Sequence, residues 1–411
     1  MATLDCVLLH QLMDEVSAVA ATPGGGVNRP ALTREDGQAR DWLRSRFDGL
    51  GMRTIIDPVG NMFGCLEFAG PGAPCVMTGS HLDSQPFGGR FDGAYGVVAG
   101  LAAASALRAA HLAGKFEPAA NLVVSNWTSE EGARFQPSLL GSSVYEGSLA
   151  LDDAYAVKDG QGISVISALD QIGYRGTGIP PRPRAYVEMH VECASDLELS
   201  NKTIGPFARY WGATKIRTAV RGQQSHTGPT PMERRRDALL GAAFMITELR
   251  ALVERASDIL HTSVGRIEAY PNSPNSVCSD VIMFVELRSR DQAVLEWAEA
   301  EFERLLQTST DRAKTVGEIL DVERRRAGVF DMALVELVEN VSSELGFATV
   351  RLDTVAAHDG IRMTSQCPSI VVAIKSIGGI CHNAKEYSEP KDLEAGATVL
   401  MKALEVLLKE L

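Results

Sequence analysis

One short polar segment, residues 78–96 (TGSHLDSQPFGGRFDGAYG), constrains the fold more than any other part of the sequence. It follows the apolar run 75–77, which predicts a buried strand, and it carries His81, Asp83 and Asp92 among several glycines. Ligands of α/β sheets bind at the C-terminal ends of strands, so the segment predicts a ligand site at such an edge. A loop of this composition is also typical of a plain turn. The choice between a ligand site and a turn depends on the other segments of the chain.

The flanking sequence alternates between strand-like and helix-like patterns. Short β-rich apolar runs predict strands, and apolar residues at helical spacing predict helices. Their alternating order predicts an α/β domain, with a mostly parallel sheet and helices on both of its faces. The predicted strands are 53–56, 62–68, 75–79, 121–126 and 184–192, and the predicted helices are 4–20, 33–50 and 97–113.

A different pattern begins after residue 205. The elements then follow the order β-α-β-β-α-β, the split arrangement of ferredoxin-like modules, which can form a compact unit. The first pattern returns afterwards with a helix, a buried strand and a closing helix. We therefore expect a discontinuous α/β domain of residues 1–205 and 326–411, interrupted by an α+β insertion at residues 206–325.

Length and charge exclude several classes of protein. A chain of 411 residues is long for one hydrophobic core, so two domains are expected. The formal net charge of −12 argues against nucleic acid or an anionic membrane as a partner, and an anionic substrate would need a local cationic pocket. Residues 1–16 contain no Lys or Arg, and no apolar run reaches membrane-spanning length without a charge. A cytoplasmic protein is therefore expected.

The cysteines are spread along the chain without a C-x-x-C pair. There are seven of them, an odd number, and this pattern favours reduced thiols over a disulfide framework. They are Cys6, Cys65, Cys75, Cys193, Cys278, Cys367 and Cys381.

Three further segments place histidines and carboxylates at strand ends or in a late glycine-rich loop. Glu130 and Glu131 follow one predicted strand, His190 and Glu192 end another, and His382 lies in the loop GGICHN. Such donors, without a thiolate motif, favour zinc, manganese or cobalt at a catalytic site. An isolated Glu-Glu pair is more often only solvated. Beside the other three sites, one glutamate can bind an ion while its neighbour, with a pKa raised by a dry pocket, acts as general base.

Several motifs together carry a family resemblance. They are GSHLDS with GG-x-FDG, NWTSEEGARF followed by GSS, EMHVE, SHTGPTPM-x-x-RRDA, PNSPNSV and H-N-A-K-E. In this order they resemble the metal-dependent amidohydrolases of the hydantoinase/carbamoylase family, within the larger group of aminoacylase and carboxypeptidase-like di-metal peptidases. The resemblance covers nearly the whole chain. It implies a parallel-sheet di-metal catalytic domain and an inserted ferredoxin-like lid and dimerisation domain.

Carried over residue by residue, the resemblance implies two divalent metal ions per subunit, zinc, manganese or cobalt. It assigns the first ion to His81, Asp92 and His190, and the second to Asp92, Glu131 and His382. Asp92 would be the bridge. The resemblance further implies that Glu130 is the general base and proton shuttle, and that Asp83 orients His81.

From the insertion, the resemblance implies that His226 stabilises the oxyanion and that Asn275 and Arg288 hold a substrate carboxylate. Arg288 also has an independent rationale, because a guanidinium can form a bidentate pair with a carboxylate. Its alternative is a surface arginine on a strand. The family also implies a homodimer.

The sequence departs from the family pattern at three places where the substrate is recognised. Cys193 stands where the family usually has glutamine, and Glu286 stands where it usually has aspartate. Before His358, the chain has residues 354–357 (TVAA) in place of a Ser-Gly-Ala-Gly run. These departures concern substrate specificity and leave the implied metal ligands intact.

The leading hypothesis is a di-metal hydrolase of a linear ureido or amide C–N bond in a small carboxylate-bearing substrate, with an N-carbamoyl amino acid as first choice. One alternative is an aminoacylase or dipeptidase that cleaves another N-acyl amide. A second alternative is a non-catalytic metal-binding scaffold. The joint presence of metal ligands and a general base favours an enzyme.

Overall fold

The computed structural model describes residues 2–256 and 259–410. The chain forms two compact units. The first comprises Met1–Ala208, Phe330–Leu352 and Ala356–Leu411, and the second comprises Arg209–Val329 with the short segment Asp353–Val355. The second unit starts and ends a few residues later than the insertion expected at 206–325, and it includes a segment that the sequence pattern does not indicate.

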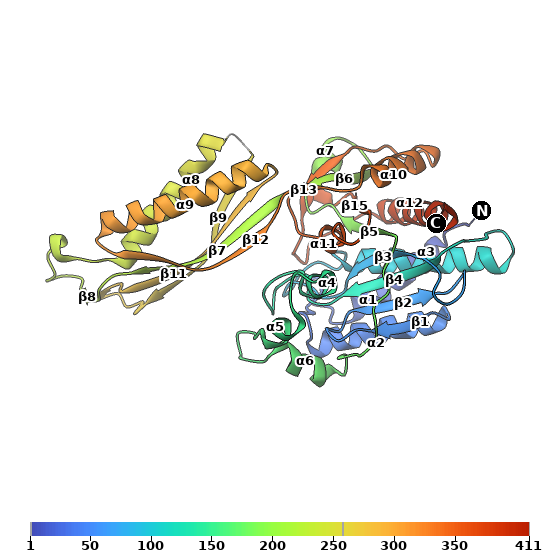
Figure 1. Ribbon diagram of the computed structural model, residues 1–411, viewed down its shortest axis with the longest axis horizontal. Coiled ribbons are helices and arrows are strands. Elements are labelled where there is room, and N and C mark those ends of the chain that lie inside the picture. Colours follow the sequence, from blue (N-terminus) through green and yellow to red (C-terminus); the bar gives the residue numbers. More distant parts are fainter. Residues whose placement is uncertain (1, 257–258, 411) are drawn as a thin grey trace. The chain divides into compact units, whose positions relative to one another are not determined.

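The larger sheet runs in the order β1-β2-β4-β3-β5-β15-β6-β13, and β14 pairs with β6 (Figure 1). Its central strands β4, β3, β5 and β15 are parallel, whereas the pairs β1/β2, β2/β4, β15/β6 and β6/β13 are antiparallel. The mostly parallel α/β class is therefore confirmed. The strands are β1 Arg53–Ile56, β2 Met62–Leu66, β3 Cys75–His81, β4 Asn121–Trp127, β5 Ala185–Val191, β6 Ile204–Tyr210, β13 Gly328–Val329, β14 Leu352–Thr354 and β15 Ser369–Ile374.

Alternate residues of the central strands enter two different apolar clusters, as the period of an extended strand requires. In β3, Val76 belongs to the large cluster that also contains α3 and α12, whereas Met77 belongs to a smaller cluster with Trp127 and Tyr145. Both faces of the sheet are thus covered, which explains why the strands are continuous apolar runs. The helices of this unit are α1 Cys6–Ala18, α2 Arg34–Gly49, α3 Ala94–Leu112, α4 Leu140–Glu146, α5 Leu151–Ala156, α6 Val165–Ile172, α7 Asp196–Leu199, α10 Met332–Glu344, α11 Asp359–Met363 and α12 Pro390–Glu410.

Two helices show how the sequence sets these elements. The side chain of Thr33 accepts a hydrogen bond from the Asp36 N–H, so Thr33 is the N-cap of α2, as its capping pattern predicts. Helix α3 is long and apolar enough to cross a membrane by length and composition alone, but 67% of its apolar window is buried inside the protein. Its apolar surface is accounted for by packing on the sheet and on α12.

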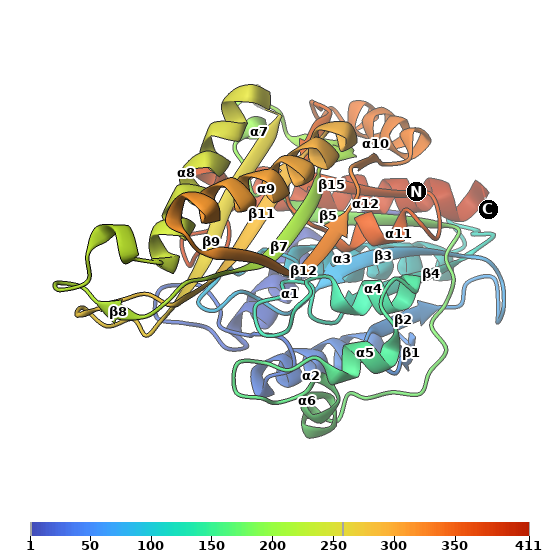
Figure 2. The same cartoon turned by 60° about the vertical axis from the view of Figure 1, so that its left-hand side comes forward.

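The second unit is a ferredoxin-like α+β module. Its main sheet is antiparallel in the order β12-β7-β11-β9, and α8 and α9 pack together against it (Figures 1 and 2). Residues such as Met245, Met283 and Phe302 form its separate core. The elements are β7 Gly212–Arg221, α8 Ala238–Ala256, β9 Leu260–Tyr270, β11 Asp280–Ser289, α9 Gln292–Ala313 and β12 Val316–Arg325, with a small ribbon of β8 Ser225–His226 and β10 Ser276–Val277 and the 3-10 turn η1 Met232–Arg234. The other 3-10 turn, η2 Ile377–Gly379, belongs to the first unit.

Candidate metal centre

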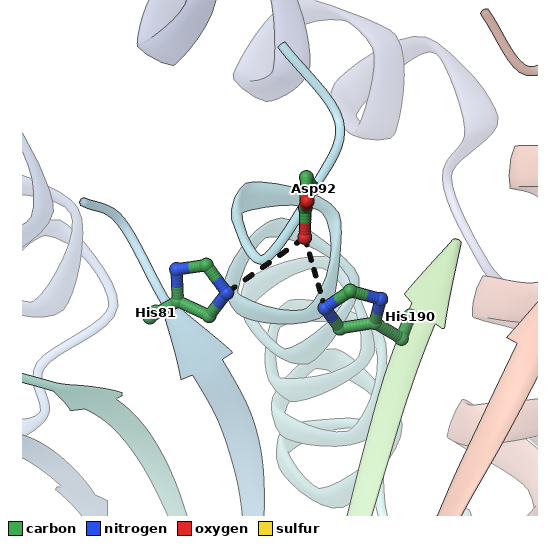
Figure 3. Close-up of side chains that lie close together, drawn as sticks. All are labelled: His81, Asp92 and His190. Carbon is green, nitrogen blue, oxygen red and sulfur yellow. Dashed lines mark ion pairs between the residues drawn. The ribbon is translucent and has the colours of Figure 1, made fainter. Parts of the chain in front are cut away.

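Asp92 lies between two buried histidines at the C-terminal edge of the larger sheet (Figure 3). His81 is the last residue of β3, and His190 is near the end of β5, the neighbouring parallel strand. Asp92 precedes α3. Its Oδ1 atom is 3.1 Å from His190 Nε2 and 3.8 Å from His81 Nε2, so that all three side chains converge on one point.

The other carboxylate oxygen of Asp92 faces a third histidine. His382 Nε2 lies 3.1 Å from Asp92 Oδ2 and 3.2 Å from Glu131 Oε2. Glu131 follows the end of β4, and His382 lies in the loop after η2 with a positive φ of 54°. The two oxygens of Asp92 therefore face two different groups of donors, which is the arrangement expected of a bridging carboxylate.

The hydrogen bonds of the buried histidines suit a cation at their Nε2 atoms. Nδ1 of His81 lies 2.9 Å from the Asp83 main-chain oxygen, and Nδ1 of His190 lies 2.8 Å from the Val191 oxygen. Because a carbonyl oxygen only accepts hydrogen bonds, Nδ1 of each ring must carry a proton. In the neutral ring, Nε2 then has no proton and presents a lone pair. Those lone pairs point toward Asp92, another acceptor. A cation between them resolves the conflict, so the residues present fit a divalent metal ion.

When no ion is bound, protons on the histidines take its place between Nε2 and the carboxylates. Burial opposes protonation of His190, but the bond to Asp92 outweighs it and raises the pKa of His190 to about 9. Bonds to Asp92 and Glu131 raise the pKa of His382 to about 10. Burial alone would raise the pKa of Asp92, yet these histidines hold it well below its usual range. Binding of a divalent ion would therefore displace protons.

Glu130 lies beside this cluster but is held differently from Glu131. Its Oε2 is 3.5 Å from His81 Nε2, and its side chain is buried. Burial, with further contributions from neighbouring carboxylates such as Asp359, raises the pKa of Glu130 well above its ordinary value. Glu131 instead accepts hydrogen bonds from the main chain and the side chain of Gln85, which fix its position.

The sequence predicts that the carboxylate of Asp83 orients His81, but its hydrogen bonds are with other residues. Its carboxylate oxygens accept hydrogen bonds from the main-chain N–H groups of Glu130 and Glu131, at 3.2 and 3.3 Å. The carboxylate is 3.8 Å from Nδ1 of His81, which is held by the main-chain oxygen of Asp83 instead. Asp83 therefore orients His81 through its backbone and the two glutamates through its side chain.

The backbone at Gly93 lies directly against the ring of His81. Gly93 has a φ of 64°, and a Cβ atom there would lie 2.3 Å from Cε1 and Nε2 of His81. A side chain at this position would therefore collide with the ring atom that faces Asp92.

Sequence reasoning did not single out several residues that support the cluster. The carboxylate of Glu386 accepts hydrogen bonds from the N–H groups of Phe91 and Asp92, at 2.8 and 3.0 Å. Glu386 ends the H-N-A-K-E motif, which could have indicated it. Buried Glu188 accepts hydrogen bonds from Ser80 and from the Gly360 N–H, and its spacing of two residues from His190 was the available signal.

His358, predicted near the substrate, is buried in the first unit. Its ring centroid is 4.4 Å from that of His190, and its ring stacks on Phe207 at 5.7 Å. With Glu188 and His190 it forms a further group of closely spaced possible ligands.

The remaining predicted residues lie in the second unit. His226 is in β8 and pairs with Ser276 of β10, and Asn275 is the residue before Ser276. His226 and Asn275 are therefore neighbours on one ribbon. Arg288 is in β11, where its guanidinium binds the Glu286 carboxylate at 2.9 Å and the Val355 carbonyl. Arg288 therefore already has one carboxylate partner.

The expectation of reduced cysteines is wrong for two residues. Cys193 and Cys381 form a disulfide, whereas Cys6, Cys65, Cys75, Cys278 and Cys367 are free. The bonded residues are separated by 188 positions, so no local spacing pattern indicates the pair. The fold brings together the end of β5 and the loop of His382.

A parallel α/β domain with a histidine and carboxylate cluster at its strand ends is typical of metal-dependent hydrolases. The family model described as Peptidase family M20/M25/M40 matches residues 77–406, and the chain belongs to this family. Members of the family are metal-dependent, and the chain is a hydrolase that acts on C–N bonds.

Individual relatives cover almost the whole chain. A protein of Mycolicibacterium smegmatis named as a hydrolase is 42% identical over 96% of this chain and 91% of its own length. N-carbamoyl-L-amino-acid amidohydrolase of Rhizobium meliloti is 33% identical over 95% and 93%. The crystal structure of a hydantoinase/carbamoylase family amidase from Burkholderia vietnamiensis matches with a TM-score of 0.92, 33% identity and coverage of 98% of both chains. The predicted resemblance to this family is confirmed.

Proposed function

We propose that this chain is a two-metal amidohydrolase that cleaves the ureido C–N bond of an N-carbamoyl amino acid. The observation that carries the proposal is the placement of Asp92, whose two oxygens face His81 and His190 on one side and His382 on the other. Glu131, on the His382 side, would complete the second group of ligands. Two groups of donors that share one carboxylate suit two ions better than one.

His81, Asp92 and His190 would hold one ion, and Asp92, Glu131 and His382 the other, as zinc, manganese or cobalt. The chemistry that such ions supply is Lewis acidity at the scissile carbonyl and a lower pKa for a water molecule at the site. The protein supplies fixed donors for them, because Nδ1 of His81 and Nδ1 of His190 are each held by a carbonyl oxygen.

Glu130 would act as the general base. Its carboxylate is buried, has a raised pKa and lies 3.5 Å from Nε2 of His81, so it can take a proton from water and deliver it to the leaving nitrogen. The Asp83 carboxylate holds the Glu130 main chain in place. In the same proposal His226 donates to the developing oxyanion, and Asn275 with Arg288 recognises the substrate carboxylate.

The choice of substrate rests on relatives and on the motifs that they share. Names of relatives include N-carbamoyl-L-amino-acid amidohydrolase, allantoate amidohydrolase and ureidoglycolate hydrolase, all of which denote linear ureido compounds. Cys193 argues against a ureido substrate, because it stands where the family has an amide side chain that both donates and accepts hydrogen bonds. Another N-acyl amide is therefore the second candidate.

A panel of substrates tests this choice. The purified protein is stripped with a chelator, reloaded with zinc, manganese or cobalt, and assayed on N-carbamoyl amino acids, allantoate and matched N-formyl and N-acetyl amino acids. We expect carbamoyl compounds to have the highest kcat/KM. A preference for acyl compounds above about tenfold, or roughly 1.4 kcal/mol in transition-state binding, would overturn the assignment. Unchanged turnover after complete metal removal would overturn the metal mechanism.

The proposal includes a homodimer that forms through the inserted module, which also serves as a lid. Exposed apolar side chains of that module, such as Leu239, Ile267 and Tyr270, support a surface that pairs with a second copy. Sedimentation velocity tests it, and a monomer at micromolar concentration would refute it. We also propose a cytoplasmic location, which five free cysteines support.

A further inference from the structure

Two segments that carry proposed metal ligands meet beside the metal centre. One follows β5 and contains His190 and Cys193, and the other is the loop with Cys381 and His382. Gly379, at a φ of 64°, brings the second loop so close to the first that an added Cβ atom would lie 2.9 Å from the Ala194 carbonyl carbon. The contact between these segments is therefore made by the backbone.

Cys193 and Cys381 join these segments covalently. Their Cα atoms are 5.0 Å apart, within the usual range for a disulfide, and the bond closes a separation of 188 residues. Cys381 directly precedes His382, and its Sγ lies 3.1 Å from Oδ2 of Asp92. Both cysteines are partly exposed, so a small thiol reagent can reach them.

The disulfide restrains the loop that carries His382. The His382 side chain is 52% exposed, and its ion pairs are with Asp92 and Glu131, the same groups that would share the ion with it. Its backbone has a positive φ of 54°, and Cys193 has the same value, so both segments hold uncommon conformations for non-glycine residues. Hydrogen bonds from the Gly378 N–H to Glu198, from the Ile377 N–H to the Tyr387 carbonyl and from Ser376 Oγ to the Ile380 carbonyl hold this loop without a metal, and the disulfide adds a covalent link.

We propose that Cys193 and Cys381 form a reversible thiol-modification site that fixes the His382 loop and so controls how firmly the neighbouring ion is retained. The proposal rests on the proposed function for the identity of that ion, but the state of the thiols does not depend on it. The co-reactant is a small-molecule disulfide of the glutathione class. A Cys381 or Cys193 thiolate attacks it, one glutathione thiol leaves, and the second cysteine displaces the other. The two protein thiols are oxidised to one disulfide, and one glutathione disulfide is reduced to two thiols, so atoms and electrons balance.

The first test follows the loop itself. Metal-free protein is equilibrated with reduced or oxidised glutathione, free thiols are counted after denaturation, and the linkage is mapped by mass spectrometry of unreduced peptides. We expect seven free thiols in the reduced form, and two fewer with a Cys193–Cys381 link in the oxidised form. Hydrogen exchange of residues 376–384 should then be slower in the oxidised form by about tenfold or more, as expected when a local opening is blocked.

The second test follows zinc. Protein loaded with zinc is mixed with a chromogenic chelator, and the oxidised form should lose its more labile zinc at least about tenfold more slowly than the reduced form, the scale of effects on residues that orient a ligand. Cys193→Ser keeps Cys381 and can form at most a mixed disulfide with glutathione, so it should show neither the Cys193–Cys381 link nor the slower hydrogen exchange and zinc release with either reagent. Cys6→Ser is the matched control, because Cys6 is partly exposed like Cys193 but forms no disulfide, and it should keep the wild-type response.

Failure to form the Cys193–Cys381 link, or equal hydrogen exchange in both forms, would overturn the inference. Equal zinc release would also overturn it, even with the link in place. If neither form bound zinc, the proposed function would fail separately, because the exchange experiment in metal-free protein would still decide whether the bond fixes the loop.

Discussion

Substitution of Gly93 by alanine tests whether the fold itself positions a metal ligand. The residue has a φ of 64°, and its added Cβ would lie 2.3 Å from Cε1 and Nε2 of His81. Real Cβ atoms do not tolerate such a distance, so either the His81 ring or the backbone before α3 must move. The ring atom that moves is the one proposed to bind the ion.

Two costs combine in Gly93→Ala. With a φ of 64° and a ψ of −51°, Gly93 lies in a sparsely populated backbone region that costs a non-glycine residue about 1–3 kcal/mol, and forcing an extra methyl group into a packed site costs typically about 1–3 kcal/mol. The sum, about 2–6 kcal/mol, is borne by stability if His81 stays in place. If His81 swings away, part of the cost is relieved, and metal affinity falls by about 10–100-fold or more, the scale seen when a ligand loses its orientation.

Gly114→Ala separates these contributions. Gly114 has a similar φ of 68°, but an added Cβ there has no neighbour within 4 Å, so only the backbone cost applies. Both variants are compared by urea denaturation and by zinc content after gel filtration. We expect Gly114→Ala to lose about 1–2 kcal/mol and keep its zinc. Gly93→Ala should lose zinc as well. Equal zinc content and equal stability in the two variants would refute the steric argument.

Further outcomes follow from the same geometry. Glu130→Gln should keep its metal and lose turnover by about 10²–10⁴-fold, whereas Glu131→Gln should lose metal; the reverse would exchange the two roles. His226→Ala should lower kcat by about 10²–10³-fold without changing zinc content, and an unchanged kcat would remove it from the mechanism. Zinc has to displace protons from His190 and His382, whose pKa values are raised to about 9 and about 10, so zinc affinity should fall as the pH is lowered below these values. Calorimetry in buffers of different ionisation enthalpy measures the released protons, and no release would contradict the hydrogen-bond analysis.

The sequence predicts most of the fold because its main signals are local. The apolar run that becomes β3, the capping pattern at Thr33 and the apolar helix α3 each follow from a few neighbouring residues. His81 and His190 are also predictable, since parallel strands end at one edge of a sheet. The order of the strands along the chain therefore already predicts that these two proposed ligands lie close together.

Other features depend on contacts that no local pattern encodes. The Cys193–Cys381 bond spans 188 residues, and only the meeting of two loops creates it. The sequence spacing of His81 and Asp83 suggests a carboxylate that orients the ring, but the backbone turns so that the Asp83 carbonyl does so instead. Because that carboxylate is released from the ring, it can hold the main chain of Glu130.

In the proposed function Arg288 recognises the substrate carboxylate, and its neighbours in the structure determine how it would do so. A guanidinium has five N–H donors, and here one donates to Glu286 and another to the Val355 carbonyl. The remaining donors can still bind a substrate carboxylate, but the charge of Glu286 offsets that of the arginine at a distance of 2.9 Å. Both side chains are 25% exposed, so water screens this effect only in part. A carboxylate ligand therefore gains less from charge than from the directed hydrogen bonds of the guanidinium, and substrates should be selected here by shape and geometry more than by charge.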